Sequence, residues 1–300
     1  MKNLFLELNK DNMLLYVKHF AQMCNRLWAL TPALAFALHK RKAMYVLFAK
    51  SDYLNYFPNL KQSNILHLYI CHNSPKPHPL EWRLGMLSEK FHLELNGDLR
   101  NIDTLGPIAF IDGWSHSCDI SYIAEHKREI VELLIPDKKT ISKVDRYFES
   151  YSGITVGVHV RRGDYKKYLR GRYYYDDRFY LDVIEKIQLL LEADGNKVRF
   201  LICSNESSLI PEVLTNAFII DNTNEITDLY ALSRCDYIVG PPSSYSQWAS
   251  FYGDVPLFLL LNDNFHEINK DSFSKILSFN KFENGNKIVL DNEKFEYTII

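Results

Sequence analysis

Cysteine is sparse in this sequence and is never clustered. The five cysteines stand singly, without a Cys-x-x-Cys pair. An odd, scattered set argues against a disulfide framework and against a structural zinc site. No apolar run approaches the length of a membrane span, and no basic start precedes a long apolar segment. These absences favour a soluble protein of the reducing cytoplasm, with neither a membrane span nor a secretory signal.

An excess of charge of one sign is also missing. The formal net charge is -2, which gives no general attraction to nucleic acid or to anionic lipid. The sequence has no Asp-x-Asp, and no Asp, Glu or His cluster has the spacing of metal ligands. We therefore expect no nucleic-acid partner and no metal, and any basic chemistry must be confined to one site.

The 300 residues are 47% apolar and 24% charged, which suits two globular domains of ordinary size. Strand-like runs alternate with helical ones, and this alternation predicts an α/β fold. In the first half we expect a strand at 44–48, a second at 108–114, an irregular middle at 51–106, and helices at 33–41, 121–134 and 138–150. We place the domain boundary near residue 150.

The second half has a clearer pattern. Apolar runs predict strands at 154–160, 198–203, 217–220 and 237–239, and helices are expected at 178–191, through 228–233, and from Ser243 toward Tyr252. Polar clusters at 159–165, 204–206 and 240–246 follow three of these strands. Because parallel α/β sheets bind ligands at the carboxyl ends of their strands, the clusters predict a nucleotide-binding domain.

Two segments have residue types suited to phosphate. In Arg161-Arg162-Gly163-Asp164, two guanidiniums match phosphate geometry, and the glycine permits a tight turn. A surface ion pair between one arginine and Asp164 explains that string equally well. In Gly240-Pro241-Pro242-Ser243-Ser244, a rigid loop opens a helix whose first N–H groups form an anion site. Simple N-capping by Ser243 or Ser244 is the alternative.

The same segments resemble a known family. His159-Val160-Arg161-Arg162-Gly163-Asp164-Tyr165 is similar to the H-x-R-R-G-D-Y motif of α-1,2-fucosyltransferases (glycosyltransferase family 11), within the wider α-1,2, α-1,6 and protein O-fucosyltransferase superfamily. The stretch from Asp228 to Trp248 resembles the family's D-x-x-x-(L/M)-S-x-C segment, which ends in S-S-x-S-x-W. Asn25-Arg26-Leu27-Trp28 is fainter: it resembles the G-N-Q-(L/M)-F loop, with Arg26 in place of Gln.

The resemblance implies a GT-B arrangement of two Rossmann-like domains facing a cleft. Residues 1–150 would form the acceptor-side domain and residues 151–300 the GDP-fucose-binding domain, with a tail able to pack back on the first. It implies an inverting, metal-independent transfer of L-fucose from GDP-fucose to a glycan, through an α-1,2 linkage to galactose. The alternatives are another GDP-sugar, an α-1,6 or protein-O linkage, or a non-catalytic nucleotide-sugar or glycan-binding protein.

Residue roles follow by matching motif positions. Arg161 would bind the diphosphate with help from Ser243 and Ser244, Asp228 would accept hydrogen bonds from guanine, and His159 would contact the nucleoside. A structural role is the alternative for His159 and Asp228. Arg162 would either join the donor site or support its loop, and Asn25 and Arg26 would contribute from the first domain. Asp164 is the favoured catalytic base, with Glu206 and Asp112 as alternatives.

The resemblance also implies a biological setting. By analogy with bacterial members of the family, we expect a cytoplasmic enzyme that builds a surface polysaccharide or O-antigen. Its acceptor glycan could be lipid-linked, which would bring the enzyme to the membrane peripherally. No cofactor is expected, because GDP-fucose is a substrate.

Overall fold

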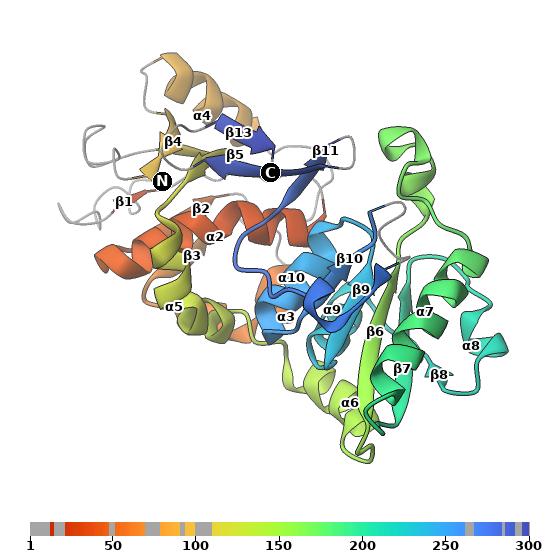
Figure 1. Cartoon of the computed structure of the whole chain (residues 1–300). Coiled ribbons are helices and arrows are strands. Elements are labelled where there is room, and N and C mark those ends of the chain that lie inside the picture. The colour runs from red at the N-terminus through yellow and green to blue at the C-terminus, as the bar shows by residue number, and fades with distance from the viewer. Residues whose placement is uncertain are drawn as a thin grey trace. The chain divides into compact units, whose positions relative to one another are not determined.

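The computed structural model describes residues 13–14, 22–47, 52–69, 79–90, 94–99, 110–261, 267–283, 286–291 and 296–299 (Figure 1). The chain forms two compact units. The first comprises Met1–Asp137 with Leu290–Thr298, and the second Lys138–Val289 with Ile299–Ile300. The functional division at residue 150 stays a prediction. None of the helices in the described ranges combines the length and apolarity that a bilayer crossing demands.

The first unit contains two parallel sheets. One has the order β1 (Met13–Leu14), β2 (Met44–Leu47), β3 (Leu66–Tyr69), and the other pairs β4 (Glu94–Asp98) with β5 (Phe110–Ser117). The helices are α2 (Met23–Lys40), α3 (Asp52–Tyr56), η1 (Pro58–Gln62), α4 (Pro79–Lys90) and α5 (Ile120–Leu133). The expectation of an irregular segment at 51–106 is therefore wrong, because five of these elements lie within it. They are short, and Pro58 and Pro79 begin helices rather than interrupt them.

Helix α2 begins earlier than the sequence predicted. Asn25 and Arg26 lie in its opening turns rather than in a preceding loop. Trp28 and the alanine-rich stretch after it are buried, so the long apolar face drives this helix into the core of its unit. The helix ends at Arg41, which adopts the left-handed conformation at φ 53°.

The second unit is organised around one parallel sheet of five strands in the order β10-β9-β6-β7-β8. The strands are β6 (Ile154–Val160), β7 (Val198–Ser204), β8 (Ala217–Phe218), β9 (Tyr237–Gly240) and β10 (Leu257–Leu259). The helices are α6 (Lys138–Phe148), η3 (Gly163–Lys166), η4 (Tyr168–Gly171), α7 (Asp177–Glu192), α8 (Ile210–Val213), α9 (Glu225–Ser233), α10 (Ser244–Gly253) and η6 (Lys270–Ser272). The chain ends with three further strands, β11 (Lys281–Glu283), β12 (Asn286–Asp291) and β13 (Glu296–Ile299), and most of β13 belongs to the first unit.

Side chains alternate between the two faces of β6. Val156, Val158 and Val160 are fully buried in a core shared with α7, and burying one such side chain contributes roughly 1.5–3 kcal/mol. On the other face, a Cβ added at Gly157 would meet Leu232 and Cys235, at the end of α9. The sheet is therefore covered by α7 on one face and by α9 on the other (Figure 1).

The strand order creates a switch point beside β6. The chain proceeds from β6 to β7 and β8 in one direction, and then returns to place β9 and β10 on the other flank of β6. The loops that leave β6 and β9 thus turn in opposite directions, and ligands of open parallel sheets bind in the crevice between such loops. These loops contain the two segments predicted to hold phosphate.

Candidate functional site

The carboxyl ends of β6 and β9 approach each other closely. Val158 is paired with Val239, and a Cβ added at Gly240 would lie 2.9 Å from Cβ of His159. Only glycine fits at position 240 without a shift of the His159 backbone. The absence of a side chain there brings the two switch-point loops together.

His159 is buried, with 5% of its surface exposed. Burial, and secondarily the charge of Arg161, lower the pKa of His159 to about 3, so the imidazole is neutral at physiological pH. Its ring lies 5.1 Å from the ring of Tyr245 on α10. Within the described part of the chain, Nδ1 of His159 is buried and has no hydrogen-bond partner. An unsatisfied buried nitrogen costs about 1–3 kcal/mol, so its presence at a ligand-binding edge points to a bound partner.

Arg161 follows directly after β6. One of its terminal nitrogens lies 2.9 Å from Oδ1 of Asp164, and its guanidinium carbon lies 5.5 Å from the ring centre of Tyr165. The Asp164 side chain is 61% exposed, so solvent weakens this ion pair. Such a carboxylate can be exchanged for a phosphate, which also binds arginine bidentately.

Tyr165 connects the two loops. Its hydroxyl donates a hydrogen bond of 2.5 Å to the carbonyl of Pro242, and it is also hydrogen-bonded to Ser243. Burial raises the pKa of Tyr165, which keeps the proton on the donating oxygen. Tyr165 belongs to the segment 159–165, but the sequence predicted no role for it. The available signal is that a tyrosine just after an arginine pair can supply both an aromatic face and a polar tip.

Ser243 is the N-cap of α10. Its hydroxyl accepts a hydrogen bond from the N–H of Tyr245, at 3.2 Å. The capping interpretation of Ser243 is confirmed, and it is compatible with phosphate binding. Other N–H groups at the start of a helix lack partners within the helix and carry partial positive charge. Ser244 is the first residue of α10, and its role toward a ligand stays a prediction.

Asp228 lies near the start of α9, which begins after the N-cap Asn224 rather than at Asp228 itself. Burial raises the pKa of Asp228 to about 6, although a hydrogen bond from Thr223 and the charge of Lys143 oppose the rise. Cys203, the neighbour of His159 across the sheet, makes a weak contact to the Asp228 carbonyl. Asp228 therefore lies on the same face of the sheet as His159.

The N-terminal ends of α9 and α10 are joined by one hydrogen bond. The hydroxyl of Tyr245 donates to the carbonyl of Glu225, at 2.7 Å. The start of α10, with its N–H groups, and the start of α9, with Asp228, are thus fixed beside the end of β6. The predicted donor site of the second unit comprises His159, Arg161, Asp228, Ser243 and Ser244. Tyr245 contacts the ring of His159 and joins the two helix starts.

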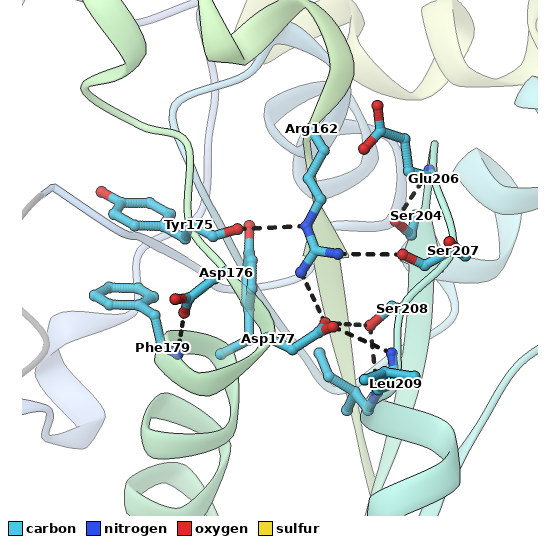
Figure 2. Close-up of polar contacts among 12 residues, drawn as sticks. Arg162, Tyr175, Asp176, Asp177, Phe179, Ser204, Glu206, Ser207, Ser208 and Leu209 are labelled. Atoms are coloured by element: carbon cyan, nitrogen blue, oxygen red, sulfur yellow. Dashed lines mark hydrogen bonds and ion pairs between the residues drawn. The ribbon is translucent and has the colours of Figure 1, made fainter.

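Arg162 points into a different environment. Its three guanidinium nitrogens donate to the carbonyls of Tyr175 and Ser207 and to the carboxylate of Asp177, the last at 2.7 Å (Figure 2). Burial alone would raise the pKa of Asp177, but hydrogen bonds from Ser208, Arg162 and the Leu209 N–H outweigh it and lower that pKa. The structure thus supports the loop-supporting interpretation of Arg162 and does not bring its guanidinium to the group around His159.

The turn between the two arginines and η3 requires glycine. Gly163 has φ +63°, and a Cβ there would lie 2.9 Å from the Asn205 side chain. Asn205 in turn accepts a hydrogen bond from the N–H of Arg162. Glu206, an alternative base, is exposed beside this turn. Asp112 lies in β5, and its side chain is outside the described part of the structure. Asn25 and Arg26 belong to the first unit, so their contribution to the site stays a prediction.

Comparisons with known proteins agree on the fold. No protein-family model matches the chain. The alpha-1,2-colitosyltransferase of Escherichia coli is 27% identical over an alignment of 185 residues, and the match covers 57% of this chain and 58% of that protein. The chain therefore spans less than two thirds of the length of that relative.

Two solved fucosyltransferase structures are similar. Arabidopsis thaliana FUT1, in complex with GDP, superposes with a TM-score of 0.54 at 14% identity, covering 89% of this chain and 74% of FUT1. Fucosyltransferase NodZ from Bradyrhizobium has a TM-score of 0.55 at 15% identity, covering 84% and 96%. The chain has the α/β fold with parallel sheets of these GT-B fucosyltransferases. The fold-class prediction is confirmed.

Proposed function

We propose that this protein is an inverting glycosyltransferase that moves L-fucose from GDP-fucose to a glycan hydroxyl, forming an α-1,2 linkage to galactose. The observation that carries the proposal is the buried, unpartnered Nδ1 of His159 beside Arg161 at the switch point. Structures with this fold include FUT1 with GDP and NodZ soaked with GDP-fucose. The name of the Escherichia coli relative supports the α-1,2 linkage.

The proposed reaction is a single displacement at the anomeric carbon. A bond forms from the acceptor oxygen to that carbon as the bond to the β-phosphate oxygen breaks, and its electron pair leaves with GDP. Negative charge grows on the diphosphate, where Arg161 and the first N–H groups of α10 stabilise it. Guanine presents two adjacent N–H donors to the carboxylate of Asp228, and His159 contacts the nucleoside. The reaction as proposed requires no metal ion and no cofactor.

Asp164 is the proposed base, and its ion pair suggests how it is activated. In the structure its carboxylate is paired with Arg161. A diphosphate that takes over the guanidinium would release this exposed carboxylate, which could then accept the proton of the acceptor hydroxyl. Binding of the donor diphosphate to Arg161 would thus also free Asp164 to act as the base. Replacing Asp164 by Asn should lower kcat and leave the affinity for GDP unchanged or higher, because a competitor for Arg161 is weakened.

The proposed setting is a bacterial cytoplasm, with a surface polysaccharide or O-antigen as the product and a lipid-linked glycan as an acceptor reached by peripheral contact. The expected cytoplasmic location rests on family analogy. A second candidate function is transfer of colitose in place of fucose, which the name of the curated relative favours. The two share the GDP-binding residues and differ only in the sugar.

A donor screen tests the proposal. Thermal stability would be measured with GDP, GDP-fucose, GDP-colitose and UDP-galactose, and GDP at about 100 times Kd should add about 2.7 kcal/mol of stability. Each GDP-sugar would then be incubated with and without β-galactosides to detect release of GDP. Failure of GDP to stabilise the protein at high concentration would contradict the donor assignment. Binding without turnover on any acceptor would instead favour the non-catalytic alternative.

A further inference from the structure

A second polar cluster lies in the first unit and shares no residue with the predicted donor site. His39, in the last turn of α2, meets Glu125 and His126 on α5. Each offers one ligand atom, and these atoms lie within 4.8 Å of one another. Nδ1 of His39 is 3.1 Å from Oε2 of Glu125, and Nε2 of His126 is 3.7 Å from Oε1 of the same carboxylate. Among the described residues, no other group has this arrangement.

The tautomer of His126 is fixed by Glu129, one turn along α5. Nδ1 of His126 lies 3.1 Å from Oε1 of Glu129. A carboxylate oxygen at this distance accepts the hydrogen bond, so the geometry places the hydrogen of Nδ1 toward Glu129. A carboxylate in this place is the usual outer partner of a metal-binding histidine.

The other nitrogen of His126 is left without a partner. Nε2 is buried and makes no hydrogen bond within the described residues. With the proton on Nδ1, the Nε2 lone pair faces a carboxylate oxygen 3.7 Å away, and two electron-rich atoms repel unless a cation or a proton lies between them. A cation would satisfy both.

The ring of His39 is held in place by an aromatic neighbour. It stacks on Tyr122, with centroids 3.8 Å apart and an interplanar angle of 14°. Two imidazoles and one carboxylate form the ligand set of zinc and similar divalent transition metals, whereas magnesium and calcium prefer oxygen ligands alone. Tetrahedral ligands at about 2.0–2.1 Å from zinc stand roughly 3.3 Å from one another. The His39 nitrogen lies 3.1 Å from Oε2 of Glu125 and the His126 nitrogen lies 3.7 Å from Oε1, and both distances are close to that value.

We propose that His39, Glu125 and His126 bind a divalent transition-metal cation of the zinc class, with Glu129 as a positioning residue. The cation joins the last turn of α2 to α5 and leaves one coordination position for water. It takes no part in the transfer reaction. Its effect is on the position of α2. A cation bound at the end of this helix also fixes its opening turns, which contain Asn25 and Arg26.

Metal titration of the purified, chelator-treated protein tests the site. Zn²⁺ should raise Tm, Mg²⁺ should not, and Co²⁺ should give the visible absorption of a tetrahedral complex. His126→Gln and His39→Gln should each abolish both effects, and Glu129→Gln should weaken the affinity by about 10–100-fold. His67→Gln is the matched control: His67 is a partly buried histidine of the same unit that stacks on Tyr45, and its response to Zn²⁺ should equal that of the unchanged protein.

Two results would overturn the proposal. One is the absence of any Zn²⁺-dependent rise in Tm in the unchanged protein. The other is equal Zn²⁺ affinity in the unchanged protein and in whichever of the His126 and His39 variants is folded by circular dichroism. In either case Glu125 and the two histidines would contact one another without a bound cation. Because the readouts are Tm and absorption, loss of transferase activity is not needed to judge the site.

Discussion

Arg161 and Arg162 are neighbours in sequence, but their environments differ. Arg162 has only 7% of its surface exposed, and all three guanidinium nitrogens donate to protein groups. Arg161, on the opposite face of the strand end, has the exposed Asp164 as its ion-pair partner. A guanidinium that the protein satisfies completely supports structure, whereas one with an exchangeable partner is available to a ligand. The comparison predicts opposite consequences for the same substitution at adjacent positions.

The largest effect is expected on stability, at Arg162. Arg162→Ala leaves Asp177 partly buried without its cation, and the free energy of unfolding should fall by about 3–5 kcal/mol. Urea denaturation would measure it. Arg172→Ala, at an exposed arginine of the following loop, is the control and should change stability by less than about 0.5 kcal/mol. If Arg162→Ala and Arg172→Ala were equally stable, Arg162 would have no special structural role, and the contrast with Arg161 would fail.

The second effect is expected on catalysis, at Arg161. Arg161→Ala removes a donor to the leaving diphosphate, so kcat with GDP-fucose should fall by about 10²–10³-fold. Its Tm should fall less than that of Arg162→Ala, because the ion pair that is lost has a solvent-exposed partner, Asp164. Arg161→Lys should recover part of the rate, since it keeps the charge but not the bidentate geometry. Near-normal turnover in the alanine variant would refute the role of Arg161.

Asp228 provides a pH-dependent test. Its pKa in the folded protein is about 6, above the ordinary value of 3.8. Its contribution to stability is therefore complete below pH 3.8 and is lost as the pH rises through about 6, a loss on the order of 3 kcal/mol. Asp228→Asn should be more stable than the unchanged protein at pH 8 and should lose affinity for GDP. Urea denaturation and GDP titration at pH 5 and pH 8 would measure both. If Asp228→Asn were stabilised at pH 8 and still bound GDP with normal affinity, Asp228 would not be the residue that binds guanine.

The smallest effect is expected at Tyr165. Tyr165→Phe removes the hydrogen bond to Pro242, which should cost about 1 kcal/mol of stability. Tyr175→Phe is a matched control, because Tyr175 donates in the same way to the carbonyl of Leu260 at the end of β10. Both variants should lose similar stability, but only Tyr165→Phe should raise KM for the donor. Equal KM values would show that Tyr165 supports the loop without positioning Arg161.

The fold of the second unit was largely predictable because its central strands are buried. Short valine- and isoleucine-rich segments such as Ile154–Val160 favour strands over helices. The segment between residues 51 and 106 was not predictable in this way, since its elements are short and their apolar pattern is weak. Helix α9 begins at Glu225, before the predicted range of 228–233, because the side chain of Asn224 caps it. Local capping chemistry, rather than apolar periodicity, sets that boundary.

The candidate site was predictable in its parts. Strand alternation predicted that His159 and Arg161 share a face. In the structure His159 lies outside the core that the valines of β6 form with α7, and the charge of Arg161 contributes to the lowered pKa of His159. The separate role of Arg162 depends on Asp177, Ser207 and Tyr175, whose proximity arises only in the folded chain (Figure 2). The cluster of His39, Glu125 and His126 could not be predicted from the sequence either, because its members come from two helices far apart in sequence. Spacing rules detect ligands on one element and miss those assembled by packing.

The position of β6 in the sheet has a consequence for how the protein folds during synthesis. It is the first strand of its sheet to leave the ribosome and the central strand of the finished sheet. One flank is covered early by β7, but the other waits for β9, whose Val239 pairs with Val158. Contacts this distant in sequence form slowly, and an unpaired apolar strand edge is prone to aggregate meanwhile. The pairing that closes this edge also brings Gly240 against His159, so the nascent chain acquires its ligand-binding edge and its protection from aggregation in the same late step.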